Sequence, residues 1–252
     1  MIVNASENVQ KFEDIISKSG FLGQKIYADY ISGQLKETNS FYVTENCAFM
    51  LSGVNLTLCG KPAALELEEI LVFCNFCGVS SIESQTDNLP MNVARQLHIM
   101  QYCGEKTENC EDICVNTDNY SFIKFCCANF HNLSFDIVYS NFARKVNRGI
   151  ADIYYLEEGG RIASGAIATK YGDDSIYITF VSTSPQHRKK GLAAKVIGHI
   201  ISCSGDRKVI LKCEDELKPF YEKLGFVATS DDYLEEGVLH VAMEQPLATR
   251  QA

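Results

Sequence analysis

Two kinds of hydrophobic spacing meet near residue 185, and a short basic turn lies between them. Residues 175–181 carry apolar side chains at every second position, which predicts a strand that ends before Pro185. From Leu192 the apolar residues fall on one face of a helix, at Leu192, Val196, Ile197, Ile200 and Ile201. The turn between strand and helix contains His187, Arg188, Lys189, Lys190 and Gly191.

The same spacing rules predict the other elements of the second half. They are a short strand at 113–115, helices at 120–129 and 134–148, a hairpin of 150–156 and 161–168, a strand at 208–213, a helix at 217–224 and a last strand at 238–243. This order predicts an α/β fold with a mixed sheet flanked by helices.

The first half has its own alternation of helices and strands. Helices are predicted at 7–18, 26–35 and 61–76, and strands at 41–44, 47–51, 54–58 and 79–84. Residues 91–102 carry no clear pattern, and a polar linker follows at 104–109. We therefore expect a smaller α/β domain at 1–108 and a second domain at 109–252.

Composition limits the function. The net charge of −9 argues against nucleic acid as a main partner, and no apolar run reaches the length of about 18 residues that a membrane helix needs. The N-terminus lacks the pattern of a signal peptide, so we expect a cytoplasmic protein. The eleven cysteines are odd in number and several lie in apolar runs, which favours buried thiols over disulfides. The spacing Cys74-x-x-Cys77 with Cys110-x-x-x-Cys114 is too loose to predict a metal site.

The turn before Leu192 has the features of an anion site. The first amides of a helix have no partner within the helix, and the helix dipole favours negative charge there. Gly191 lets a phosphate approach the backbone, whereas three basic residues at this end oppose the dipole unless an anion is bound. The turn lacks the pattern of a nucleoside-triphosphate loop and of a dinucleotide fingerprint.

Two motifs in this half resemble those of the GNAT N-acetyltransferases. Arg188-x-x-Gly191-x-Ala193, preceded by the residues VSTSP at 181–185, is similar to the pyrophosphate loop of that superfamily. The segment PFYEKLGF at 219–226 is similar to its C-terminal signature. The resemblance covers roughly the last half of the chain and implies the GNAT fold with acetyl-CoA as cosubstrate and no metal. No such loop follows the strand at 79–84, so the first domain is either a degenerate copy of this fold or an unrelated α/β domain.

The resemblance also implies roles for single residues. The phosphates of acetyl-CoA would be held by Arg188, Lys189, Lys190, Gly191, Leu192 and Ala193. The backbone of Val181 and Thr183 would pair with the acetyl and pantetheine part, and Tyr221 would protonate the leaving thiolate. The other interpretation of Tyr221 is a core aromatic residue. The chain lacks the asparagine that many members carry after the strand matching 208–213, and no general base is identified.

We therefore expect an acetyl-CoA-dependent N-acetyltransferase that acts on a primary amine. The alternative is a non-catalytic acyl-CoA-binding or regulatory protein with the same fold, and an interaction scaffold without a ligand is disfavoured by the basic turn. The amine acceptor and the oligomeric state, a homo-oligomer included, stay open.

Overall fold

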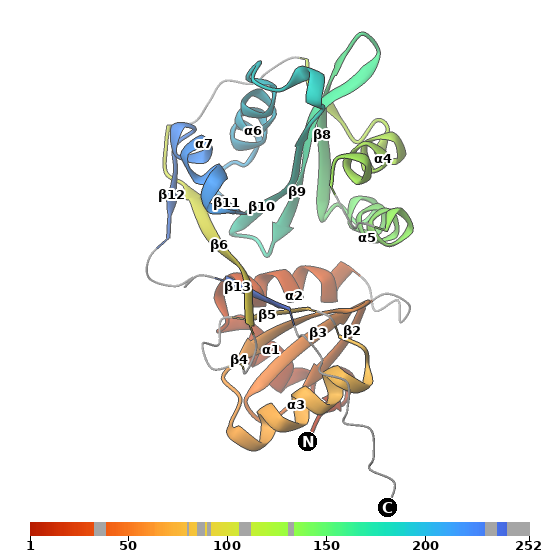
Figure 1. Ribbon diagram of the computed structural model, residues 1–252, viewed down its shortest axis with the longest axis vertical. Helices are drawn as coiled ribbons and strands as arrows, with labels where there is room; N and C mark the ends of the chain where they lie inside the picture. Colours follow the sequence, from red (N-terminus) through yellow and green to blue (C-terminus); the bar gives the residue numbers. More distant parts are fainter. Residues whose placement is uncertain are drawn as a thin grey trace, which may run out of the picture.

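The computed structural model describes residues 1–32, 39–79, 81–84, 89, 92–105, 112–130, 134–229 and 236–240. It has two halves, each built on a mixed sheet with helices on both faces (Figure 1). No helix in these ranges is long and apolar enough to cross a membrane.

The sheet of the N-terminal half contains β1 (Val3–Asn4), β2 (Asn39–Val43), β3 (Cys47–Ser52), β4 (Asn55–Gly60) and β5 (Ser81–Ser84). One face packs on α1 (Val9–Ser17) and α2 (Gly20–Ser32) through a core that includes Phe12, Phe21 and Ile26. The other face packs on α3 (Ala64–Phe76) through Phe49, Leu58 and Ile70. The predicted helix at 26–35 therefore starts earlier, because Phe21 and Leu22 are also fully buried on its inner face.

The sheet of the C-terminal half is formed by β7 (Cys114–Val115), β8 (Ala151–Glu158), β9 (Arg161–Tyr171), β10 (Ser175–Thr183), β11 (Lys208–Cys213) and β12 (Phe226–Ala228), together with part of β6. On one face lie α4 (Asn119–Asn129) and α5 (Phe135–Asn147), and on the other lie α6 (Leu192–Cys203) and α7 (Lys218–Lys223) (Figure 1). The predicted hairpin, the strands at 113–115, 175–181 and 208–213 and the helices of this half are confirmed, with ends that differ by a few residues. The last predicted strand, at 238–243, is described only to His240, and its place in this sheet is wrong, because it pairs with β5 of the N-terminal half.

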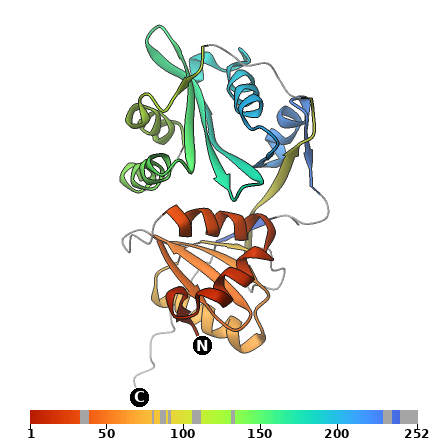
Figure 2. The ribbon, with the colours of Figure 1, turned by 180° about the vertical axis from the view of Figure 1, so that it is seen from behind.

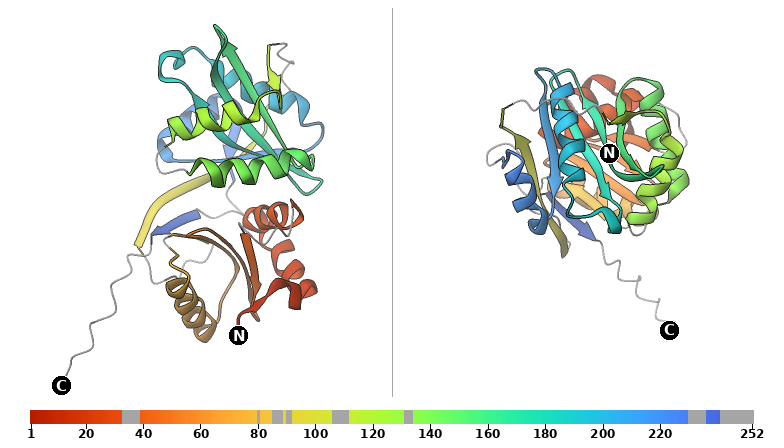
Figure 3. Two further views of the ribbon diagram at one scale, coloured as in Figure 1. Left: turned by 90° about the vertical axis from the view of Figure 1, so that its right-hand side faces the viewer. Right: turned by 90° about the horizontal axis from the view of Figure 1, so that it is seen from above.

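Two strands connect the halves. The long strand β6 (Asn92–Tyr102), which the sequence pattern left unassigned, pairs with β11 and β12 in one sheet and with β13 (Glu236–His240) in the other. β13 also pairs with β5, so the last strand joins the N-terminal sheet (Figure 3). Four strand pairs, β5–β13, β6–β11, β6–β12 and β6–β13, thus cross the predicted boundary at 108/109, and that boundary stays a prediction.

Helix α2 lies on the side of the N-terminal half that faces the C-terminal half (Figure 2). Phe21 contacts the rings of Tyr171 and Tyr177, with ring centroids 5.7 and 4.8 Å apart. Both tyrosines belong to the C-terminal sheet, so aromatic packing joins the halves beside α2.

Of the cysteines in the two spaced pairs, Cys74 is buried, whereas Cys77 and Cys114 are half-buried. Cys74 is buried in the core under α3, and burial raises the pKa of its thiol to about 12. Cys110 lies outside the described residues. No cluster of three or more histidine, cysteine or acidic side chains suited to a metal ion occurs in the described ranges.

The start of α3 makes stability depend on pH. Burial alone raises the pKa of Glu66, but hydrogen bonds from the Asn46 side chain and from the amides of Ala63 and Asn46 outweigh it and hold the pKa at about 2, against 4.5. A lowered folded-state pKa contributes stability above the unfolded value, and this contribution is lost as pH falls from about 4.5 to about 2.

We expect Glu66→Gln to remove a pH-dependent contribution on the order of 2 kcal/mol to the free energy of unfolding between pH 6 and pH 2.5. Urea unfolding of the two proteins at several pH values measures this difference. The exposed Glu68→Gln serves as the control, and equal pH slopes for wild type and Glu66→Gln would contradict the assignment.

Candidate active site

Strands β10 and β11 are paired at one end and separate at the other. Their parallel ladder runs from Ser175 opposite Lys208 to Ile178 opposite Leu211, and no pairing between them follows in the described residues. Beyond that point lies a cavity of about 470 Å³. Its lining consists of Phe130, Tyr177, Ile178, Thr179, Phe180, Val181, Lys212, Cys213, Glu214, Leu217 and Tyr221. We call this cavity the slot.

A bulge in β10 forms one wall of the slot. The regular alternation predicted for residues 175–181 is wrong at its end, because the pairing with β9 shifts between Thr179 and Ser182. Phe180 has a φ of 53°, in a region that bulky side chains rarely adopt. Its ring makes edge contacts with Phe130 and Phe142, with centroids 5.6 and 5.3 Å apart. Tertiary packing therefore holds this strained residue in place.

The bulge sets the direction of the backbone groups that follow. The Ser184 amide donates to the Ala163 carbonyl of β9 at 2.9 Å, and bonding alternates along an antiparallel pair. The amide of Thr183 therefore points away from β9, toward the side on which β11 has separated. Ser164 holds this stretch, because its hydroxyl donates to the Ser182 carbonyl at 3.0 Å and lies 2.8 Å from the Thr183 hydroxyl.

The predicted basic turn connects the end of β10 to α6. It begins with a 3₁₀ turn at Pro185–His187 and passes through Lys189 and Gly191, whose φ angles are 63° and 77°. Gly191 is the N-cap of α6, and no side chain caps that helix end. The helix amides at Leu192 and Ala193 therefore present hydrogen-bond donors to a ligand, as expected for an anion site.

The charged side chains of the turn are partly neutralised by one acid. Glu158, in the β8–β9 hairpin, lies 3.3 Å from the His187 Nε2 and 3.5 Å from the Lys190 Nζ. Arg188 donates from Nε to the Thr183 carbonyl at 3.3 Å, which connects the turn to the strand that forms the slot. None of the residues from Arg188 to Ala193 lines the slot itself, whereas Val181 and Tyr221 do.

Both interpretations of Tyr221 agree with its position. It is 5% exposed, with ring centroids 5.0 Å from Phe220 and 5.9 Å from Phe226, so it belongs to the core. It also lines the slot. The pKa of the Tyr221 hydroxyl is raised, mainly by burial and to a smaller extent by the neighbouring Cys213. The phenol therefore stays protonated at neutral pH and can act as a hydrogen-bond donor.

Several lining residues were not identified from the sequence. Cys213 is buried against Met100, and burial raises the pKa of its thiol to about 11. Of the acids in the 214–216 turn, Glu214 lines the slot, whereas Asp215 pairs with His98. Asp173 and Asp174 lie in the turn between β9 and β10 and border other hollows. The sequence signal that could have indicated Cys213 as a lining residue is its position at the end of the predicted strand at 208–213, before the short helix at 217–224.

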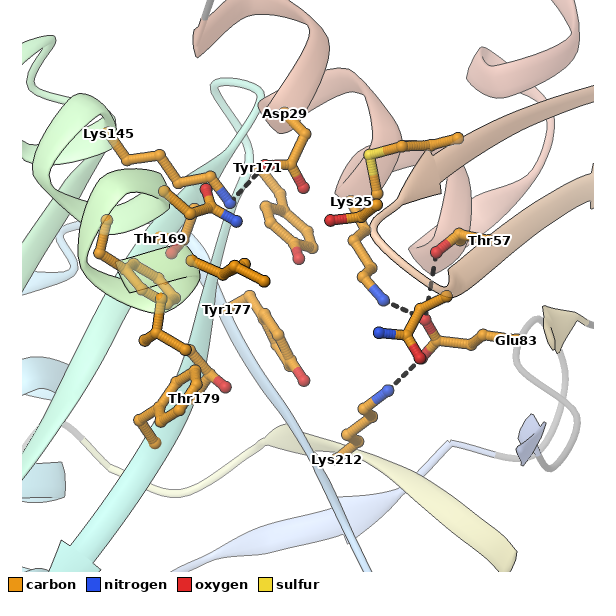
Figure 4. Close-up of a pocket in the computed structure, with 18 of the residues that line it drawn as sticks. Lys25, Asp29, Thr57, Glu83, Lys145, Thr169, Tyr171, Tyr177, Thr179 and Lys212 are labelled. Atoms are coloured by element: carbon orange, nitrogen blue, oxygen red, sulfur yellow. Dashed lines mark hydrogen bonds and ion pairs between the residues drawn. The ribbon is translucent and has the colours of Figure 1, made fainter. Parts of the chain in front are cut away.

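A second cavity, of about 380 Å³, lies between the two halves. It shares Tyr177, Thr179, Phe180 and Lys212 with the slot. Glu83 of β5 forms ion pairs with Lys25 of α2 and with Lys212 of β11, and it accepts a hydrogen bond from Thr57 at 3.4 Å (Figure 4). Across the cavity, Lys145 of α5 pairs with Asp29 of α2 at 2.7 Å, and both side chains are 6% exposed. We call this space the interhalf cavity.

Comparisons with known proteins agree with this architecture. Residues 127–247 match the family model described as "Acetyltransferase (GNAT) domain". A GCN5-related N-acetyltransferase from Sphaerobacter thermophilus covers 95% of this chain and 94% of its own, with 12% identity and a TM-score of 0.62. A structure described as a tandem GNAT protein from the clavulanic acid biosynthesis pathway covers 94% and 96%, with 8% identity and a TM-score of 0.62.

A curated relative, a UPF0039 protein of Schizosaccharomyces pombe, is 27% identical over 93 residues. The match spans 35% of this chain and 62% of that relative's length. At these identities the structural likenesses establish the fold. Together with the family match they show that this chain has the GNAT fold and carries a GNAT acetyltransferase domain in its C-terminal half.

Proposed function

We propose that the protein is an N-acetyltransferase that moves the acetyl group of acetyl-CoA directly to a primary amine. The observation that carries this proposal is the continuous path from the slot, along the free edge of β10, to the N-terminus of α6. The slot, the edge of β10 and the N-terminus of α6 suit the thioester, the pantetheine and the phosphates of acetyl-CoA, in that order. We propose that phosphates bind the amides and side chains from Arg188 to Ala193, that pantetheine follows Val181 and Thr183, and that the thioester lies beside Tyr221.

The chemistry needs few groups. The neutral amine attacks the thioester carbonyl carbon, the carbon–sulfur bond breaks, and the thiolate leaves. Backbone amides at the β10 bulge supply donors where negative charge develops on the carbonyl oxygen. The Tyr221 hydroxyl donates to the departing sulfur, which lowers the barrier to its release. We propose that the proton of the amine passes to water, and we assign no role in this step to Glu214, which also lines the slot.

We expect Tyr221→Phe to lower turnover about 10- to 100-fold, because the departing thiolate loses its donor. Acetyl-CoA affinity is expected to change by less than about twofold, because the lost hydroxyl does not contact the phosphates. Thiol release from acetyl-CoA measures turnover, and calorimetry measures affinity. Tyr154→Phe is the matched control, since Tyr154 is 8% exposed in the same core and does not line the slot. Equal turnover of wild type and Tyr221→Phe would remove this role.

Acetyl-CoA with a panel of amines tests the activity as a whole. Thiol release with at least one amine supports the transferase. Binding of CoA without release on any amine would favour the non-catalytic acyl-CoA-binding protein, and the missing asparagine after β11 is the feature that favours that alternative. Absence of CoA binding would contradict both.

We place the protein in the cytoplasm, because no disulfide joins the described cysteines, as expected in a reducing compartment.

A further inference from the structure

We propose that the acceptor is a small molecule that carries a carboxylate as well as its amine, and that the interhalf cavity binds it through Lys25, Glu83 and Lys212. This inference rests on the proposed acetyl transfer and names the substrate class for it. It also assigns a role to the N-terminal half, which contributes Lys25 and Glu83.

The position of the cavity supports this assignment. An acceptor must reach the thioester from outside the space that acetyl-CoA fills. The interhalf cavity meets the slot at Tyr177, Thr179, Phe180 and Lys212, beside the bulge of β10. A molecule in the cavity therefore lies beside the slot and also contacts residues of the N-terminal half.

The charge of the cavity selects among amines. The whole chain is acidic, with a net charge of −9, yet the described lining contains three lysines and two acids. Both acids already form ion pairs with lysines, so the described lining has one surplus positive charge. A polyamine would add positive charge to a partly buried space, which is unfavourable. An acceptor with a carboxylate adds no net positive charge as a zwitterion, and it offsets the surplus when its amine is neutral.

The geometry at Glu83 allows both the amine and the carboxylate of such a molecule to be bound. One carboxylate is shared by Lys25, which pairs with Oε2, and Lys212, which pairs with Oε1 (Figure 4). The incoming ammonium can pair with Glu83 in place of one lysine, and that lysine then pairs with the carboxylate of the acceptor. Each ion pair that breaks is replaced by another, so no buried charge is left alone. The volume of about 380 Å³ suits a molecule of amino-acid or dipeptide size.

Matched acceptor pairs test the proposal. Wild-type protein with saturating acetyl-CoA is given alanine or ethylamine, leucine or isoamylamine, and phenylalanine or phenethylamine, and thiol release is followed. We expect kcat/KM, calculated at one pH from the concentration of neutral amine, to be at least about tenfold higher for the acid of each pair. Equal or higher values for the simple amines would overturn the proposal.

Variants of Lys25 assign the effect to the cavity. Lys25→Met should raise KM for the acids about tenfold. The ratio of kcat/KM between each acid and its simple amine should then approach one, because KM for the simple amines changes little. Lys25→Arg should retain most of the preference, because it keeps the charge. Lys11→Met is the control, since Lys11 pairs with Glu45 at 2.5 Å outside the cavity. An unchanged preference in Lys25→Met would contradict the assignment.

A second measurement separates the two proposals. If CoA binds but no amine supports thiol release, the proposed transfer fails. Calorimetric titration of the CoA-bound protein with phenylalanine and with phenethylamine then tests the cavity alone. Tighter binding of phenylalanine, lost in Lys25→Met, would support the carboxylate site, and equal binding of both would overturn it.

Discussion

Gly191→Asp is expected to weaken CoA binding at least about a hundredfold while the protein stays folded. Gly191 adopts a φ of 77° at the N-cap of α6, and a side chain there costs about 1–2 kcal/mol of backbone strain. The larger effect is electrostatic. An aspartate would place its negative charge where the phosphates of CoA are proposed to bind, and a hundredfold loss corresponds to about 2.7 kcal/mol.

The chain offers a matched control at the other end of the same helix. Gly205 has a φ of 63°, and a Cβ at either glycine would meet no atom within 4 Å. Gly205→Asp therefore brings the same charge and a similar strain but lies beyond the C-terminus of α6, far from its N-cap. Calorimetry with CoA should show near wild-type affinity for Gly205→Asp. Equal affinities of the two variants would contradict the proposed phosphate site.

Lys145→Met is expected to lower the free energy of unfolding by about 3–5 kcal/mol, because it leaves the carboxylate of Asp29 buried without its lysine. The Lys145–Asp29 pair joins α5 to α2 across the halves. Lys18→Met is the control, since Lys18 pairs with Asp14 at 2.6 Å but the two side chains are 71% and 55% exposed. For that pair we expect a change below about 1 kcal/mol. Urea unfolding at pH 7 measures both.

A second substitution identifies the cause of the loss. Adding Asp29→Asn to Lys145→Met removes the carboxylate that has lost its lysine and should restore part of the stability. If the double variant is no more stable than Lys145→Met, the lost contact between the Lys145 Nζ and the Phe142 ring, whose centroid is 5.4 Å away, accounts for the effect instead.

The cofactor half of the candidate site could be predicted because its elements are local. The strand β10, the basic turn and α6 follow one another in the chain, and each has its own signal: alternation, a proline and glycine, and a helical apolar face. The position of Tyr221 is also local, since it belongs to the short helix after β11. Its role stays a prediction, as do the roles of Val181, Thr183 and the turn residues.

The bulge at Phe180 could not be predicted, because its backbone is held by rings from α4 and α5 that are distant in sequence. The same holds for β6. Its residues show no single periodicity, and its two ends pair with strands of different sheets.

Patterns in the sequence were enough to predict the class of fold, the basic turn at a helix N-terminus and the resemblance to an acetyl-CoA-binding family, because these depend on residues close together in the chain. The separation of β10 and β11 at the slot, and the second cavity that shares lining residues with it, follow from contacts between distant segments. Glu83, Lys25 and Lys212 are far apart in sequence and show no motif. They come together because α2 and β5 of one half pack beside β11 of the other, and such long-range packing leaves no periodic signal in a single chain.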